Sequence, residues 1–247
     1  MTNFTKRHKL GLIGYPLSHS FSPGYFARKF EELGITDAEY LAYSIEKVEE
    51  VFELFDQHVT GLNVTIPYKE EVIPFLDELS EEAYEIQAVN TIRIVNGRKT
   101  GYNTDAYGFE VSLQQLLGNT KVEKALVLGT GGAAKAIKYV LQKMKINYTE
   151  VSRKKPLLTY TELNPETIES NRLIINTTPL GMYPKIDECP DLPYSALTEK
   201  HFLYDLVYNP EKTLFLKKGE LQGSRIKNGF EMLVLQAEKA WEIWNQH

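Results

Sequence analysis

The chain has 247 residues, enough for one large domain or two ordinary domains that each bury a core. Its hydrophobic content of 43% and charged content of 25% are those of a globular protein. The formal net charge of −5 argues against sequence-independent binding of nucleic acid or of an anionic membrane, since both need a basic surface. We therefore expect small-molecule partners, with neither nucleic acid nor a membrane among them.

The single cysteine, Cys189, cannot form an internal disulfide, and the chain has no Cys/His spacing typical of a zinc site. We expect an inert thiol, no bound metal and a reducing compartment. The basic residues at 6–9 precede only a short apolar run that glycine and proline interrupt, so we expect no signal peptide. The chain contains no run of about 18 apolar residues, which a helix needs to cross a bilayer. The sequence therefore predicts a cytoplasmic protein.

Residues 10–14 predict a first strand, followed by a loop rich in hydroxyl groups. Ser22 before Pro23 is typical of a helix start, with serine as the N-cap, and the helix is expected to reach about residue 34. The loop serines, including Ser20, either cap and turn the chain or form a site for a polyol. A strand at 38–45 and an amphipathic helix at 47–57 should follow.

Residues 61–69, Gly-Leu-Asn-Val-Thr-Ile-Pro-Tyr-Lys, form the stretch around which we expect the site to be organised. At the period of a strand, Asn63, Thr65 and Lys69 share one face. Polar groups at the carboxyl end of a strand in an open α/β sheet face the crevice where ligands bind, and a lysine there can donate or accept a proton. The alternative is an edge strand followed by a solvated lysine.

Helices are predicted at 70–79, where Pro74 kinks or splits the helix, and at 81–87. The next segment predicts a hairpin, with strands at 88–95 and 98–103 around Asn96-Gly97, which places Asn90 near its open end. An apolar-periodic helix then runs to Gly118. Taken alone, the residues before it make Thr104 or Asp105 a helix N-cap.

A buried strand at 124–128, a glycine turn, a helix at 133–144 and a strand at 147–151 begin a second unit. Gly129, Gly131 and Ala134 satisfy the G-x-G-x-x-G/A pattern in the required context, which predicts a dinucleotide site; the alternative is a simple strand-to-helix turn. Many NAD-binding proteins place an acid at the end of the second strand, but this chain has Ser-Arg-Lys-Lys at 152–155. Cations there favour the 2′-phosphate of NADP.

Strands near 173 and 202 should end in polar loops that border the nucleotide cleft. The final helix is expected at 230–244, where Gln236 interrupts an apolar stripe. A buried glutamine either bonds to the backbone or points at a ligand.

These motifs resemble those of shikimate dehydrogenase. The resemblance covers nearly the whole chain, and the motifs follow one another in the order typical of that family. The matching pieces are Ser20–Pro23, Asn63–Lys69, Ala88–Thr91, Asn103–Asp105, Gly129–Ala134, Asn176–Met182, Tyr208–Pro210 and Gly229–Leu233 with Gln236. The resemblance implies a two-domain α/β fold: a substrate-binding catalytic domain at 1–103 plus 225–247, to which the C-terminal helix returns, and a doubly wound, Rossmann-like NADP domain at 104–224. It also implies reduction of 3-dehydroshikimate to shikimate, a step of chorismate and aromatic amino acid biosynthesis, by an NADP-dependent oxidoreductase that is a monomer or homodimer.

Carried over by position, the resemblance implies three sets of residues. The catalytic pair would be Lys69 and Asp105. The substrate would be held by this pair together with Ser20, Ser22, Thr65, Asn90, Tyr208 and Gln236. The cofactor would be bound by Gly129, Thr130, Gly131, Gly132, Ala133, Ser152, Arg153, Lys154, Thr177, Met182, Val207 and Gly229.

The chain departs from the family pattern at three places: at 24–26, where many members have a histidine-asparagine pair, at Gln87, where a glycine usually stands, and at Ser152, where an asparagine usually stands. None of these departures removes a catalytic position. The serine at 152 would weaken contact with the adenosine ribose. The competing functions are a dehydrogenase acting on quinate or on folate-linked one-carbon units, and a non-catalytic NADP-binding sensor on the same fold.

Overall fold

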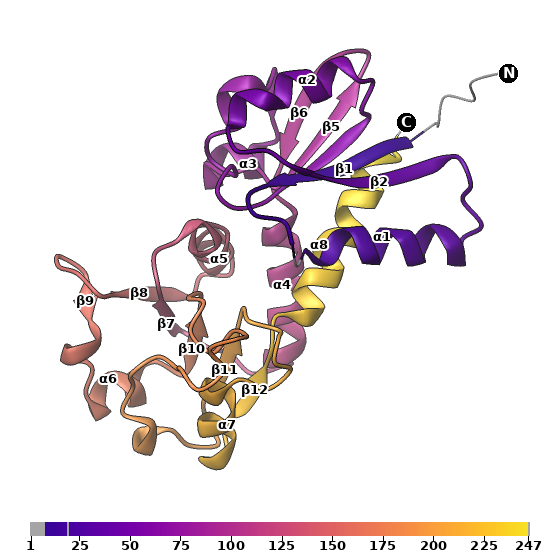
Figure 1. The fold of residues 1–247 in the computed structure, drawn as a ribbon. Coiled ribbons are helices and arrows are strands. Elements are labelled where there is room, and N and C mark those ends of the chain that lie inside the picture. Colours follow the sequence, from indigo (N-terminus) through magenta and orange to yellow (C-terminus); the bar gives the residue numbers. More distant parts are fainter. Residues whose placement is uncertain (1–7, 19, 247) are drawn as a thin grey trace, which may run out of the picture. The chain divides into compact units, whose positions relative to one another are not determined.

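The computed structural model describes residues 8–18 and 20–246, which divide into two compact units (Figure 1). The first unit takes in the chain up to Thr104 and from Ala237 onward, and the second takes in Asp105–Gln236. Each unit has its own six-stranded sheet. The architecture is therefore two-domain α/β, as the sequence predicts.

The first unit is built on a mixed sheet in the order β2-β1-β3-β5-β6-β4. Strand β1 pairs in parallel with β2 and β3, whereas β5 runs antiparallel to β3 and β6. The strands are β1 (His8–Gly14), β2 (Ala38–Ser44), β3 (Gly61–Val64), β4 (Glu78–Leu79), β5 (Thr91–Val95) and β6 (Arg98–Tyr102).

Both faces of this sheet are covered, because apolar residues on its strands point alternately to opposite sides. Ile13 and Leu62 pack on the side of helix α2 (Val51–Asp56), with the short helix η1 (Val48–Glu50) before it. Leu10 packs on the other side, against α1 (Phe21–Glu32) and the end of α8 (Phe230–Trp244).

The end of α8 is fixed to the first unit by its last tryptophan. The Trp244 indole donates to the Ile92 carbonyl oxygen at 2.9 Å. A Cβ atom at Gly61 would lie 2.4 Å from the Trp244 Nε1 atom, so only glycine lets the ring lie against β3. Residues 237–246 therefore belong to the first unit although the sheet of that unit is complete by Tyr102.

The second unit is a wholly parallel sheet in the order β12-β11-β10-β7-β8-β9. Counted from its own first strand, this is the order 6-5-4-1-2-3 of doubly wound dinucleotide-binding folds. The strands are β7 (Lys124–Leu128), β8 (Asn147–Ser152), β9 (Leu158–Thr159), β10 (Leu173–Asn176), β11 (Phe202–Asp205) and β12 (Arg225–Lys227). The helices are α4 (Thr104–Leu117), α5 (Gly132–Lys143), α6 (Pro165–Ser170) and α7 (Leu214–Leu221), with short helices η3 (Tyr160–Glu162) and η4 (Tyr194–Ala196).

Several local predictions are confirmed. Asn96 and Gly97 have φ values of 51° and 81°, as the two central residues of a type I′ hairpin require. Gly118, with φ 55°, follows the end of α4, and α8 has the predicted bounds. These elements carry strong local signals, so tertiary context does not override them.

The helix predicted at 70–79 is wrong. Turns run from Ile66 to Val72, followed by the short helix η2 (Ile73–Phe75) and then β4, which pairs with β6. Pro74 has no amide hydrogen to continue a helical ladder, and the Asp77 amide instead donates to the Lys99 carbonyl oxygen at 2.9 Å. Recruitment of this segment to the edge of the sheet therefore replaces the helix.

The strand predicted from Gly61 to a stop at Pro67 is also too long. It ends at Val64, and the Tyr68 amide donates to the Thr65 carbonyl oxygen at 2.9 Å in a turn. Only Asn63 of the predicted polar face lies in the sheet, so Thr65 and Lys69 reach the end of the sheet through the turn. At α1, the helix begins at Phe21 with Ser20 as its N-cap residue, which corrects the predicted cap at Ser22.

The return of the chain to the first unit comes later than the predicted residue 225. Strand β12 extends the second sheet by pairing with β11, and the division between the units falls inside α8, at Gln236 and Ala237. The sequence could not show this boundary because a single continuous helix spans it.

Gln87 holds a left-handed backbone conformation, with φ 57°, at the end of helix α3 (Glu81–Ile86). Glycine adopts this conformation without a Cβ clash, so we expect Gln87→Gly to raise the free energy of unfolding by about 0.5–1 kcal/mol. Urea denaturation measures the change. Gly118→Ala is the matched control: a Cβ there meets nothing within 4 Å, so the same left-handed strain should lower stability. Equal stability of the Gln87→Gly variant and the parent would contradict the prediction.

Candidate functional site

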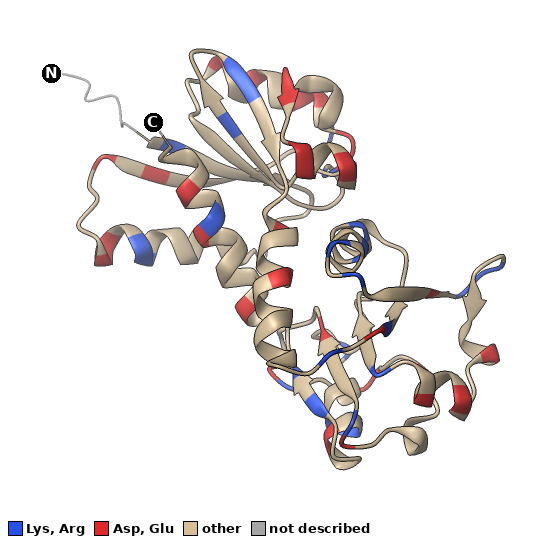
Figure 2. Cartoon of the chain, turned by 180° about the vertical axis from the view of Figure 1, so that it is seen from behind, with Lys and Arg blue, Asp and Glu red and all other residues tan. Residues whose placement is uncertain are grey.

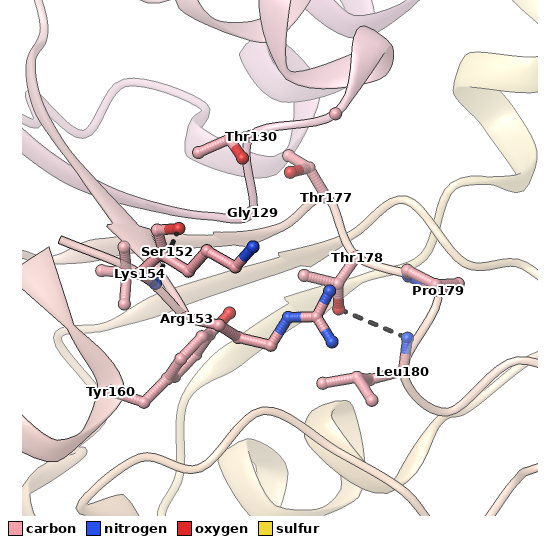
Figure 3. A pocket seen from close by; sticks show the side chains of 12 residues that line it. Gly129, Thr130, Ser152, Arg153, Lys154, Tyr160, Thr177, Thr178, Pro179 and Leu180 are labelled. Carbon is pink, nitrogen blue, oxygen red and sulfur yellow. Dashed lines mark hydrogen bonds between the residues drawn. The ribbon is translucent and has the colours of Figure 1, made fainter. Parts of the chain in front are cut away.

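A cavity of about 520 Å³ lies at the carboxyl ends of β7, β8 and β10 (Figure 3). The chain reverses its direction of strand addition between β7 and β10, and open α/β sheets bind ligands at that point. Three loops line the cavity, at residues 129–131, 152–154 and 177–180. Val151 and Tyr160 complete the lining.

The turn after β7 requires glycine at its first position. Gly129 has φ 106°, and a Cβ there would lie 2.8 Å from the Thr177 Oγ1 atom. By contrast, a Cβ at Gly131 or Gly132 would meet nothing within 4 Å, so the space before the first turn of α5 is open. The free amides and the dipole at the start of this 12-residue helix favour an anion in that space.

The basic residues after β8 form the next side of the cavity. Arg153 and Lys154 are exposed, and the Ser152 hydroxyl accepts from the Lys154 amide at 3.3 Å. Within the described residues, no carboxylate lies in ion-pair range of the Arg153 or Lys154 side chain. Figure 2 shows basic residues on this loop and along α5. The acid of this strand, Glu150, pairs with Lys138 at 3.1 Å and is not part of the cavity lining.

A buried polar network holds the third loop in place. The Asn176 Oδ1 atom accepts from the Thr178 amide at 3.0 Å and from its hydroxyl at 2.6 Å. The Asn176 Nδ2 atom donates to the Asp205 carboxylate at 2.9 Å, and the Thr177 hydroxyl donates to the Leu128 carbonyl oxygen at 2.8 Å. The wall formed by 177–180 is thus anchored to β7 and β11.

This lining fits a dinucleotide phosphate. The open glycine turn and the α5 amides suit a pyrophosphate, and the cations after β8 suit a further phosphate on the adenosine ribose. Gly132 and Ala133 belong to the first turn of α5, next to the lining. Met182, Val207 and Gly229 lie outside it: Met182 is exposed, Val207 is buried, and Gly229 packs tightly against Leu206.

In the first unit, polar residues gather at the end of the sheet where β1 and β3 finish. The Thr65 amide donates to the Ile13 carbonyl oxygen at 2.9 Å, and the Val64 amide donates to the Asn90 carbonyl oxygen at 2.9 Å. The Val89 amide donates to the Lys69 carbonyl oxygen at 2.7 Å. Thr65 and Lys69 come from the segment after β3 and Asn90 directly precedes β5, so two segments bring these residues to one edge.

Asn90 also fixes the start of α4. Its Oδ1 atom accepts from the Thr104 amide at 2.7 Å, and its Nδ2 atom donates to the Thr104 hydroxyl at 3.0 Å. The side chain is almost fully buried. Asn90 thereby holds the residue directly before Asp105, which is half-buried in the first turn of α4.

The two loop serines differ. Ser20 is half-buried at the N-cap position of α1, yet its hydroxyl makes no capping hydrogen bond. Ser22 is buried and hydrogen-bonded to the Tyr40 hydroxyl, which itself donates to the Asn63 Oδ1 atom at 2.7 Å. Ser22 therefore has a packing role within the first unit, whereas capping does not occupy the Ser20 hydroxyl.

The remaining predicted substrate residues lie in the second unit. Tyr208 is half-buried after β11, and burial raises the pKa of its hydroxyl. Gln236 is buried, and its Nε2 atom donates to the Leu233 carbonyl oxygen at 2.9 Å, so it makes the backbone bond that was one of its two predicted alternatives.

Sequence reasoning missed Val151, Tyr160 and the residues at 178–180 among those lining the cavity. The latter directly follow Thr177 in the motif and could have been included. Nothing in the sequence around Tyr160 marks it, because its position depends on how β9 pairs with β8.

In the part of the chain that the structure describes, no helix is long and apolar enough to span a membrane. Residues 12–92 match the model of the shikimate dehydrogenase substrate-binding domain. An NADP(+) shikimate dehydrogenase of Clostridium beijerinckii is 41% identical over 252 residues, covering 96% of this chain and 91% of the relative.

Two solved structures show the same fold. The shikimate 5-dehydrogenase of Thermus thermophilus, in complex with NADP(H) and shikimate, superposes with a TM-score of 0.84 and 31% identity over 96% of this chain and 93% of its own. The quinate dehydrogenase of Corynebacterium glutamicum, in complex with NAD, superposes with a TM-score of 0.87 and 26% identity over 96% of this chain and 93% of its own.

Proposed function

The chain belongs to the shikimate dehydrogenase family, and we propose on that premise which of its residues carry the reaction. It is an NADP-dependent oxidoreductase acting on a CH–OH group, and its reaction is the reversible reduction of 3-dehydroshikimate to shikimate. The observation within the structure that carries this function is the cavity at the switch point of the second sheet, lined by the glycine turn and by Arg153 and Lys154. The first unit would bind the substrate and the second the cofactor.

When bound, NADPH supplies a hydride to the ketone carbon of the substrate. Negative charge then builds on the carbonyl oxygen, and the Lys69 ammonium would stabilise that charge and donate the proton that completes the alcohol. Asp105 would accept a hydrogen bond from a substrate hydroxyl and orient the ammonium. The position of Asp105 in the first turn of α4 supports this assignment, since Asn90 fixes the residue before it.

The other polar residues would bind the substrate without chemistry, because neutral hydroxyls and amides are poor proton-transfer groups but good partners for hydroxyls. Ser20 has the best support in the first unit, since capping leaves its hydroxyl unused and it stands at a half-buried helix start. Ser22, Thr65, Asn90, Tyr208 and Gln236 complete the proposed set.

One assay tests the function. Reduction of 3-dehydroshikimate is followed by loss of nicotinamide absorbance, with NADPH and NADH side by side, and oxidation of quinate serves as a third arm. We expect turnover with 3-dehydroshikimate and NADPH to exceed the other combinations. Faster turnover of quinate would change the substrate assignment, and binding of NADPH without any turnover would favour the sensor.

Arg153→Ala should raise the KM for NADPH by roughly 10-fold or more, because a charge-assisted hydrogen bond to phosphate contributes about 1.5–3 kcal/mol. The KM for NADH, which has no 2′-phosphate, should change little. Steady-state kinetics with both cofactors measures the split, and Lys185→Ala, an exposed lysine outside the cavity lining, is the control. An equal rise for both cofactors would contradict the role of Arg153.

The finer expectations of a cytoplasmic location and of a monomer or homodimer stay part of this proposal. The single cysteine supports a reducing compartment. Light scattering of the purified protein would decide its assembly.

A further inference from the structure

The connection between β8 and β9 is unusually short for a parallel pair. Parallel neighbours are usually joined by a dozen or more residues that include a helix, but here five residues, 153–157, make the crossover. Ser152 pairs with Thr159 in the register of the two strands. Arg153 and Tyr160 therefore each stand one residue beyond a strand end, at the same edge of the sheet.

An acidic residue ties this connection together. The Glu162 carboxylate accepts from the Thr159 amide at 2.9 Å and from the Thr159 hydroxyl at 2.8 Å, and it forms an ion pair with Lys155. The hydrogen bond from Lys155, followed by those from Thr159, lowers the pKa of the Glu162 carboxyl to about 2. Lys155 is thus engaged within the loop, and Tyr160 is held at the start of η3 inside this arrangement.

Tyr160 lines the same cavity as Arg153, and Figure 3 shows the two side chains at one edge of it. Within the described part of the chain the Tyr160 hydroxyl has no hydrogen-bond partner, although the side chain is half-buried. Burial raises the pKa of this hydroxyl, and the positive charge of Arg153 acts in the opposite direction. The phenol is neutral near pH 7, so it can offer a proton to an acceptor.

A guanidinium group donates hydrogen bonds and accepts none. The phenol beside it can donate a second hydrogen bond to the same ligand. Two donors at one edge of a cavity call for an acceptor rich in oxygen atoms. A phosphate on the adenosine ribose has that chemistry, and its charge also suits Arg153.

We propose that Tyr160 is a further specificity-determining residue, whose hydroxyl donates to the 2′-phosphate of NADP beside Arg153. The inference rests on the proposed function, in which NADP occupies this cavity. It adds a neutral donor from the end of β9 to the basic residues that follow β8. Selectivity for the phosphorylated cofactor is then shared between two neighbouring strands.

Binding of small probes separates this role from catalysis. Adenosine 2′,5′-bisphosphate and AMP differ only by the 2′-phosphate, and calorimetry measures the Kd of each. Tyr160→Phe removes only the hydroxyl and should weaken binding of the bisphosphate by roughly 10-fold while leaving AMP unchanged. Tyr148→Phe is the matched control, since Tyr148 lies near the opposite end of β8 and its hydroxyl accepts from Gln142 at 3.1 Å.

The outcomes keep the two claims apart. If Tyr160→Phe binds the bisphosphate as tightly as the parent while Arg153→Ala binds it weakly, the role of Tyr160 is overturned and the NADP site stands. If Tyr160→Phe weakens binding of both probes equally, the hydroxyl does not contact the 2′-phosphate and the inference again fails. If the parent itself does not distinguish the two probes, the assignment of NADP to this cavity fails.

Discussion

Lys69→Ala is expected to lower kcat for 3-dehydroshikimate reduction by roughly 100-fold or more, because proton donation and stabilisation of the oxygen charge are lost together. Asp105→Asn should have an effect of similar size. The amide keeps the shape of the side chain at the start of α4 but removes the charge that would orient the ammonium. Steady-state kinetics at saturating NADPH measures both.

Lys69→Arg separates the two parts of the lysine's role. Arginine keeps the positive charge but does not release its proton under these conditions, so a variant that stays slow would identify proton transfer as the limiting loss. Lys121→Ala, at an exposed lysine that pairs with Glu123, is the control and should keep the parent rate.

The rival interpretation makes Lys69 a surface residue and Asp105 an acid that only stabilises the helix start; α4 begins at Thr104, so the predicted N-cap role of Asp105 is wrong. In that case both substitutions would change stability but hardly alter turnover. Circular dichroism and NADPH titration show whether each variant is folded and binds its cofactor. Folded variants that bind NADPH and turn over near the parent rate would remove Lys69 and Asp105 from the catalytic pair.

The parts of the fold that the sequence predicts well are those with local physical causes. The type I′ turn at Asn96-Gly97 needs two positive φ values, and Gly129 needs a conformation that only glycine adopts without strain. The periodicity of α5 and α8 is long enough to identify each helix without tertiary information.

The parts that the sequence could not predict depend on partners distant in the chain. Residues 78–79 join a sheet edge because β6 offers them hydrogen bonds, which a helical pattern at 70–79 does not reveal. The Asn90 side chain is engaged by Thr104, 14 residues later, so its positioning of α4 is visible only in the structure. Tyr160 reaches the cavity through the register of β8 and β9, which no local motif encodes.

Asp205 is the buried acid of the second unit that the reaction does not use. Its carboxylate accepts from Asn176 at 2.9 Å, from the Val207 amide at 3.0 Å and from the Thr213 hydroxyl at 2.5 Å. Burial raises the pKa of this carboxyl from 3.8 to about 6, against the opposing effect of the three hydrogen bonds. Asp205 therefore joins the cavity wall at 177–180 to the loop after β11.

Asp205→Leu should lower the free energy of unfolding by about 3 kcal/mol or more, because three buried donors lose their acceptor. The KM for NADPH should rise as well, since Asn176 would no longer be held against the wall. Asp191→Asn, at an exposed position of the same unit, is the control and should leave both quantities unchanged. Unchanged stability of Asp205→Leu would show that the donors find other acceptors.

Asp205→Asn tests the charge separately. Because the folded-state pKa lies above the unfolded value, the folded protein holds the Asp205 proton to higher pH than the unfolded chain does. The stability from this group is fully present below pH 3.8 and is lost as the pH rises through 6, a change of about 3 kcal/mol. Urea denaturation of the parent and Asp205→Asn from pH 4 to 7.5 should therefore give a difference that favours the variant increasingly as the pH rises. Parallel curves would mean that the three hydrogen bonds offset the cost of burying the charge.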